Sequence, residues 1–216
     1  MVAARGRGDA GTATQILDVA ERLAQVRGFN GFSYADIAAE VGITKAALHY
    51  HYASKADLGE ALIGRYAARF SEALAAIDAA AVAAPAMLRG YAELYADVLR
   101  NQRMCLCGML AAEYPTLPDA MRASVVSFFD HNEAWLQQVL EQGRGDGSLH
   151  FSGSARDVAR MIISCLEGAM LVARPYDDVP RFQDAAASLV ESLTSPPSSR
   201  PGGRLPEPRT QAWHPA

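Results

Sequence analysis

Apolar residues recur at spacings of three and four along most of the chain, and alternating runs of β-branched residues are few. This spacing follows the period of a helix, about 3.6 residues, and not the alternation of a strand. Serine or threonine stands before several of the periodic stretches, where its side chain can cap the first turn of a helix. The pattern therefore predicts an all-α protein with about nine helices.

The expected helices cover about residues 13–27, 33–40, 44–50, 54–81, 85–100, 105–113, 118–142, 155–174 and 180–193. Thr12 is expected to cap the first helix, which Gly28 ends, and glycines at 143, 145 and 147 are expected to stop the seventh. The segments we expect are a flexible arm (1–11), a helix-turn-helix domain (12–54), a helical domain (55–194) and a tail (195–216). The tail is rich in Pro, Ser, Gly and Arg, a composition that predicts disorder.

The stretch Val41-Gly42-Ile43 interrupts the apolar period between two short helices. Ser33 precedes the first helix, with Asp36 three residues later as in a capping box, and Thr44 precedes the second. Two short helices around a glycine-containing turn form a helix-turn-helix, in which the second helix is free to enter a major groove. This segment is the strongest functional signal in the pattern.

The charge of the chain is unevenly distributed. The net charge is −4, which for the whole chain argues weakly against a nucleic-acid partner. The first 55 residues, however, hold six Lys or Arg against five Asp or Glu, a net of +1, so the remainder carries −5. Both lysines of the chain, Lys45 and Lys55, fall in or beside the helix-turn-helix. The placement favours an anionic partner for that segment.

The run Ser33-Tyr-Ala-Asp-Ile-Ala-Ala-Glu-Val-Gly-Ile-Thr-Lys-Ala-Ala-Leu-His-Tyr-His-Tyr-Ala-Ser-Lys-Ala-Asp-Leu58 resembles the DNA-binding motif of the TetR family of transcription regulators. The shared features are a capping serine, an Ile-Ala pair, a glycine turn, a capped recognition helix, an aromatic and histidine cluster, and Ser-Lys-x-Asp-Leu. The resemblance is close over about residues 12–60. His49 departs from it, because the family usually has tyrosine at the start of the aromatic cluster.

The expected DNA contacts follow from these positions. Thr44 and Lys45 stand at the start of the recognition helix, the end that usually meets base edges, and His49 and Tyr50 share its exposed side. The residues expected to bind phosphates are Ser33, Tyr34, Tyr50, His51 and Lys55. Arg5 and Arg7 of the arm are candidates for a minor groove. Taken singly, each of these side chains would more often be a solvated or packing residue.

For the rest of the chain the resemblance implies a helical ligand-binding and dimerisation domain. Family members pair two helices from each subunit into a four-helix bundle, here those at about 155–174 and 180–193. Such a homodimer would present two recognition helices about 34 Å apart to a two-fold operator in double-stranded DNA. The residues expected to line a pocket for a small-molecule effector are Tyr91, Tyr95, Cys105, Met109, Phe128, His131, Trp135 and Cys165. An apolar set of this kind is more often plain core, and both interpretations stay open.

Cys105 carries a sharper hypothesis. The run from Cys105 to Glu113 resembles the branch of the family that contains the N-ethylmaleimide-responsive repressor, whose members sense electrophiles or oxidants through a cysteine. A thiol at a helix N-terminus, with Arg103 close in sequence, should have a lowered pKa. The competing interpretation is a buried, inert cysteine. A cysteine–lysine crosslink is excluded, since no lysine follows Lys55.

The sequence therefore indicates a DNA-binding transcription regulator. We expect a repressor that a small apolar or electrophilic effector releases from a palindromic operator. The first alternative is an enzyme. The sequence has no glycine-rich phosphate loop and no catalytic Ser-His-Asp motif. Glu113, His131 and Glu167 could be polar groups of a pocket, but they are scattered along the chain and are a weak signal of catalysis. A small-molecule carrier with a vestigial helix-turn-helix is the second. We expect no metal and no cofactor. The lack of an apolar run of about 18 residues and of a secretion signal predicts a cytoplasmic protein without a membrane span.

Overall fold

The computed structural model describes residues 3–196, with side chains from residue 11 onward. Over these residues the chain forms helices joined by short turns and loops, with no strand, which confirms the predicted all-α class. Two short 3₁₀ turns, Tyr114–Thr116 and Arg174–Tyr176, follow α6 and α8. The helices in chain order are α1 (Ala3–Arg27), α2 (Tyr34–Val41), α3 (Lys45–His51), α4 (Lys55–Ala80), α5 (Ala84–Arg100), α6 (Leu106–Ala112), α7 (Asp119–Asp146), α8 (Ala155–Ala173) and α9 (Val179–Thr194).

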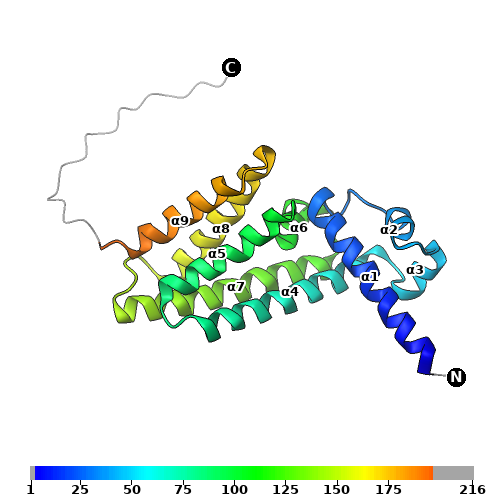
Figure 1. Ribbon diagram of the computed structural model, residues 1–216, viewed down its shortest axis with the longest axis horizontal. Helices are drawn as coiled ribbons and strands as arrows, with labels where there is room; N and C mark the ends of the chain where they lie inside the picture. The colour runs from blue at the N-terminus through cyan, green and yellow to red at the C-terminus, as the bar shows by residue number, and fades with distance from the viewer. Residues whose placement is uncertain (1–2, 197–216) are drawn as a thin grey trace, which may run out of the picture.

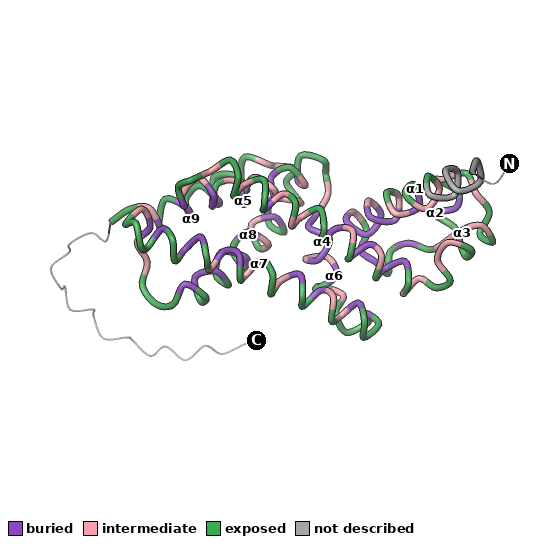
Figure 2. Tube along the Cα trace, turned by 90° about the horizontal axis from the view of Figure 1, so that it is seen from below, coloured by how far each residue is buried: buried purple, intermediate pink, exposed green. Residues whose placement is uncertain are grey.

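The helices form an elongated molecule with two parts (Figure 1). The three N-terminal helices gather at one end, here called the head (α1–α3), and the remaining helices form the body (α4–α9). Helix α4 leads from the head along the length of the body beside α7. Helix α8 packs against α7 and α9, and α5 packs against α7 and α9. Figure 2 shows the buried positions recurring along each helix, as the apolar period predicts.

The predicted start of the first helix was wrong. Helix α1 begins at Ala3, so the backbone of residues 3–11 is helical and Thr12 lies inside the helix instead of capping it. The alanines of this segment favour helix, and no proline stops it. The side chains of Arg5 and Arg7, proposed for a minor groove, lie outside the described residues. The tail predicted for 195–216 also falls outside them, apart from Ser195 and Pro196.

Helix α7 runs past two of the glycines that were expected to end it. Gly143 is a buried residue within the helix, where an added β-carbon would lie 2.5 Å from Leu149 and 2.8 Å from Ala84. A glycine inside a helix costs only about 1 kcal/mol, and here it lets other parts of the chain approach closely. The helix ends instead at Gly147, whose φ of 76° is the left-handed conformation common after a helix C-terminus.

The core of the body is built around aromatic side chains. The rings of Tyr91 and Trp135 are stacked with centroids 5.6 Å apart, and Phe70 contacts Tyr91, Tyr95 and Phe128. The hydroxyl of Tyr91 lies 3.1 Å from that of Tyr95 and donates to Oδ1 of the buried Asn132 at 3.1 Å. These bonds satisfy polar groups that burial would otherwise leave without partners.

The head is joined to the body by a buried charged cluster as well as by apolar packing. Glu21 of α1 is only 4% exposed and pairs with Arg65 at 2.8 Å and with Arg69, both from α4. A buried carboxylate is tolerated only when it is paired in this way. The apolar core of the head consists of Ile16, Ala20, Leu23, Ala24, Phe29, Phe32, Ile37, Ala38 and Leu48, and Leu58 at the start of α4 is buried as well.

Candidate DNA interface and effector cleft

The two short helices of the head are fixed by their caps. Ser33 and Asp36 form a capping box at α2, in which Oδ2 of Asp36 accepts from the backbone N and Oγ of Ser33 at 2.7 and 2.6 Å. Gly42 ends α2 in the left-handed conformation with φ 76°. Oγ1 of Thr44 then accepts from the backbone N of Ala47 at 3.1 Å and starts α3. The caps predicted at Ser33 and Thr44 are therefore present, and they define the turn between the helices.

Burial separates the two faces of α3. Leu48 is fully buried against the head core, and Ile37 and Ala38 of α2 are buried with it. Thr44, Lys45, His49 and Tyr50 are exposed on the other side, and Tyr50 is 77% exposed. At this exposure the ring edge and the hydroxyl of Tyr50 are accessible to an external group. The exposed side of α3 is thus available to a groove along its whole length.

The remaining residues proposed to bind phosphates differ in how accessible their side chains are. The hydroxyl of Tyr34 donates to the backbone oxygen of Tyr52 at 3.0 Å, and burial raises its pKa to about 12. Its ring lies 4.7 Å from that of His49, whose Nδ1 is 3.1 Å from the backbone oxygen of Ala53. His51 is half-buried beside the ring of Tyr50. Ser33 is held by its cap, so Lys45 and Tyr50 are the most accessible of the set.

Lys55 was expected to face phosphates, and the structure gives it another role. Its ammonium donates to the backbone oxygen of Phe29 at 2.5 Å and to that of Phe32, and lies over both phenylalanine rings. Burial lowers its pKa. The cation at this helix start is therefore compensated by the carbonyls of the α1–α2 turn and not by an external anion. Two of its three hydrogen-bond donors are committed to these carbonyls.

A cleft with a volume of about 320 Å³ lies between α4 and α7. Its apolar wall includes Ile63, Phe70 and Phe128, and its polar groups include His131 and the buried Asn132. Nε2 of His131 lies 3.2 Å from Oγ of Ser71 across the cleft, so a hydrogen bond joins α7 to α4. An apolar cavity with a few polar groups is the usual form of a small-molecule site.

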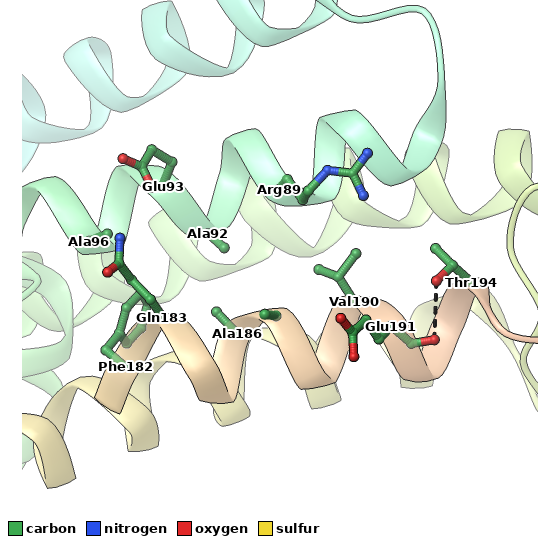
Figure 3. Close-up of a pocket in the computed structure, with 11 residues that line it drawn as sticks. Arg89, Ala92, Glu93, Ala96, Phe182, Gln183, Ala186, Val190, Glu191 and Thr194 are labelled. Atoms are coloured by element: carbon green, nitrogen blue, oxygen red, sulfur yellow. Dashed lines mark hydrogen bonds between the residues drawn. The ribbon is translucent and has the colours of Figure 1, made fainter. Parts of the chain in front are cut away.

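A second cavity, of about 270 Å³, lies between α5 and α9 (Figure 3). Phe182, Ala186 and Val190 of α9 face Ala92 and Ala96 of α5, and Arg89 lies at one end. None of the residues predicted to bind an effector lines it. It is a groove between neighbouring helices of the body and does not touch α4.

Comparison with known proteins agrees with this arrangement. The family described as "Bacterial regulatory proteins, tetR family" matches residues 16–62, and "Tetracyclin repressor-like, C-terminal domain" matches residues 84–189. The crystal structure of a TetR-family transcriptional regulator from Agrobacterium tumefaciens is similar to 87% of this chain and 100% of its own, with 32% identity and a TM-score of 0.84. The chain belongs to the TetR family. Its helix-turn-helix is that of a DNA-binding transcription regulator.

Two curated TetR-type relatives are also similar along most of their length. The transcriptional repressor NemR of Escherichia coli is 23% identical over 189 residues, which cover 86% of this chain and 95% of NemR. The transcriptional regulator AcuR of Cereibacter sphaeroides is 28% identical over 177 residues, which cover 79% of this chain and 80% of AcuR. The predicted resemblance to the TetR family, and to its N-ethylmaleimide-responsive branch, is confirmed by these matches.

The eight residues predicted to line one effector pocket do not share a cavity. Phe128 and His131 line the α4–α7 cleft, and Trp135 lines a separate cleft where its Nε1 donates to Asp78 at 3.0 Å. Tyr91, Tyr95 and Cys105 are buried in the core. Met109 packs against Arg174, and Cys165 is exposed on α8. A helical period identifies inward-facing positions, but it does not distinguish a side chain beside a cavity from one packed against another side chain.

The expectation of a lowered pKa for Cys105 was wrong. Cys105 caps the N-terminus of α6, and its Sγ accepts from the backbone N of Gly108 at 3.4 Å. It is, however, 1% exposed and close to Glu167, and burial together with that carboxyl group raises the pKa of the thiol well above its usual range. Desolvation outweighs the helix N-terminus here. The thiol is protonated at neutral pH, as in the alternative of a buried cysteine.

Sequence reasoning missed the residues that tie the head to the body. Glu113 was noted only as a scattered acid, yet its carboxylate accepts from the backbone N of Phe29 and of Asn30. Asn132 was not noted, although it is buried behind the cleft. The Glu113 contacts join residues more than 80 positions apart, and the burial of Asn132 depends on how α7 is rotated against its neighbours. No local sequence pattern predicts either. The only hint in the sequence was Gly28, the glycine that ends the first helix next to Phe29.

No helix in the part of the chain that the structure describes is long and apolar enough to cross a bilayer. No group of three His, Cys, Asp or Glu side chains among the residues of that part is arranged to hold a metal ion.

Proposed function

We propose that this TetR-family protein is a homodimeric repressor whose two α3 helices bind a palindromic operator, and that a small effector in the α4–α7 cleft releases it. The observation that carries DNA binding is the exposed face of α3, with Lys45 and Tyr50 unobstructed and the helix fixed by the Thr44 cap. Repression is the activity named for the relative NemR. A protein that binds operators in this way works in the cytoplasm.

The proposed effector site is the α4–α7 cleft because α4 continues into the head. An occupant would contact Phe70 and Phe128 and reach the polar pair His131 and Ser71. These groups suit a small apolar molecule, aromatic or aliphatic, with one hydrogen-bonding group. The buried thiol of Cys105 supports an effector that binds reversibly over one that reacts as an electrophile.

Dimerisation is supported by apolar residues left exposed on α8. Met161, Leu171 and Val172 are 42%, 63% and 55% exposed, and Cys165 and Gly168 are exposed between them. The spacing places them along one side of the helix, next to α9. Exposed apolar side chains in a row mark an interaction surface, and the predicted bundle of helices 155–174 and 180–193 would cover them.

The test is selection of bound sequences from a library of random DNA duplexes at fixed, moderate salt. We expect enrichment of a palindromic site, lost in Lys45→Ala. Arg89→Ala, which removes an exposed cation from α5, is the matched control and should bind like the wild type. Selection of no site by the folded dimer, before and after unfolding and refolding to remove any bound ligand, would overturn the proposal and favour the vestigial carrier.

A further inference from the structure

The turn between α1 and α2 is held from two sides by opposite charges. The Glu113 carboxylate, at the end of α6, accepts from the backbone N of Phe29 at 2.6 Å and of Asn30 at 3.2 Å. The Lys55 ammonium, at the start of α4, donates to the backbone oxygens of Phe29 and Phe32. The peptide groups of a turn have no hydrogen-bond partners within a helix, so Glu113 and Lys55 provide the hydrogen bonds that water would otherwise make. Charged partners make such hydrogen bonds stronger than neutral ones.

The carboxylate fits the turn closely. Gly28 has a φ of 83°, and a β-carbon at this position would lie 2.7 Å from Oε1 of Glu113. Nδ2 of Asn30 donates to Oγ1 of Thr116 at 2.8 Å, just beyond Glu113 in the chain. Glycine is therefore required at position 28 both for the backbone conformation and for the space that the carboxylate occupies. The turn is therefore bonded directly to Glu113 and Thr116, the residues that follow α6.

The same part of the body also holds the end of α1. The backbone N and O of Met104, just before α6, exchange hydrogen bonds with the O and side-chain Nε2 of the buried Gln25 at 3.3 and 3.0 Å. Arg174, at the end of α8, donates to the backbone oxygen of Val26. The head is thus attached at several points to the segment Met104–Thr116, here called the strap, and at one further point to the end of α8.

The opposite side of the strap is fixed in the core of the body. Sγ of Cys105 accepts from the hydroxyl of Tyr66 on α4 at 3.6 Å. Gly108 lies so close to Glu167 on α8 that a β-carbon would collide with the carboxyl group. Close-packed interiors have few voids and transmit strain, so we expect a shift of α4 or α8 to displace α6.

We propose that Glu113 is a positioning residue for DNA reading, through which the strap fixes the orientation of the helix-turn-helix relative to the body. The proposal rests on the proposed function for its DNA step. The other part of the proposal, that Glu113 restrains the orientation of the head, depends neither on DNA nor on an effector. Glu113 itself does not contact DNA; it acts through the α1–α2 turn.

The first test is amide hydrogen exchange in the full chain without DNA. Glu113→Gln keeps the size of the side chain but replaces one acceptor oxygen by an NH₂ group that cannot accept from the turn. We expect exchange at Phe29 and Asn30 to rise about tenfold while the amides of α7 and α8 keep their rates. The matched control is Glu133→Gln, which loses an ion pair to Arg160 within the body and should leave the turn unchanged. A uniform rise along the chain, or no rise in the turn, would overturn the proposal.

The second test measures the head directly. Spin labels at Ala46 on α3 and Ala134 on α7, both exposed, would report the head-to-body distance in a Cys165→Ser background. Dilution with unlabelled protein restricts the signal to pairs within one chain. We expect a narrow distance distribution in the wild type and a broader one in Glu113→Gln. Equal widths would contradict the positioning role even if exchange had changed.

The DNA step separates this inference from the proposed function. Glu113→Gln should bind the selected operator at least about tenfold more weakly and retain its sequence preference, whereas Lys45→Ala should lose the operator with an unchanged turn. Full operator affinity in Glu113→Gln would overturn the positioning role alone. Failure of the wild type to select any DNA would overturn the proposed function, while the exchange and distance results would still decide whether Glu113 restrains the head.

Discussion

Gly108 on α6 and Glu167 on α8 are in such close contact that a β-carbon at position 108 would collide with Oε2 of the Glu167 carboxyl group. The other oxygen of this group, Oε1, is buried and has no hydrogen-bond partner among the described residues. Burial raises the pKa of Glu167 to about 7. A carboxyl group that is neutral over part of the physiological range therefore lies between the strap and α8.

Glu167 makes stability depend on pH. Because the pKa of Glu167 is higher in the folded state, the native protein binds more protons than the unfolded chain between about pH 4.5 and 7, and stability falls as pH rises through this window. Above pH 7 the loss is complete, about 3 kcal/mol at most. Urea unfolding of Glu167→Gln and wild type should give a stability difference that grows in favour of the variant from pH 4.5 to 8. A pH-independent difference would contradict the assignment.

The three cysteines should differ sharply in reactivity. Cys165 is exposed, whereas Cys105 and Cys107 are buried with raised pKa values. A maleimide reagent at pH 7 should modify Cys165 rapidly in the folded monomer, at dilutions where the proposed dimer has dissociated, and the other two thiols only after unfolding. Mass spectrometry of wild type and Cys165→Ser decides the matter. Rapid native labelling in Cys165→Ser would restore Cys105 as a candidate sensor.

The Thr44 cap should matter more for DNA binding than for overall stability. Thr44→Ala removes the acceptor for the backbone N of Ala47 at the start of a helix of only seven residues. We expect a cost of about 1 kcal/mol, concentrated in the fraying of α3, and weaker operator binding. Ser154→Ala removes the equivalent cap of α8 and is the control. If both variants bind DNA equally well, α3 does not need its cap to read a groove.

The hydroxyl of Tyr91 should stabilise the body from within. Tyr91→Phe leaves Oδ1 of the buried Asn132 without its donor, at a cost of about 1–3 kcal/mol. Tyr114→Phe, at an exposed position, should cost far less and serves as the control. Thermal unfolding of both variants measures the difference. Equal melting temperatures would mean that water takes over the bond to Asn132.

The head could be predicted from sequence because its determinants are local. Ser33, Thr44 and Ser54 each stand next to the helix that they cap, and Gly42 provides the left-handed turn at the expected place. Lys55 shows the limit of the same reasoning. A cation at a helix start was expected to face an anion, the DNA phosphate, but in the structure its partners are two backbone oxygens in a turn about 25 residues earlier.

The cleft between α4 and α7 could not be predicted from the sequence because it depends on how the helices rotate against one another. Tyr91 and Phe128 are both apolar, aromatic and inward-facing, yet Tyr91 is enclosed by other side chains and Phe128 borders a cavity. The restraint by Glu113 escaped for a different reason: Glu113 and Phe29 are 84 positions apart. Charge and spacing along the chain carry no information on such a contact.

The length of α4 gives small movements in the body a large effect on DNA. Its 26 residues span about 39 Å without interruption, from Ala80 to the capping box beside the recognition helix, and the cleft lies along the part of α4 nearer that box. A tilt of about 5° around its far end displaces its near end by about 3 Å, close to the spacing of roughly 3.4 Å between successive base pairs. Under the proposed function, a slight reorientation of α4 by an effector would be enough to place α3 one base pair out of register with its operator.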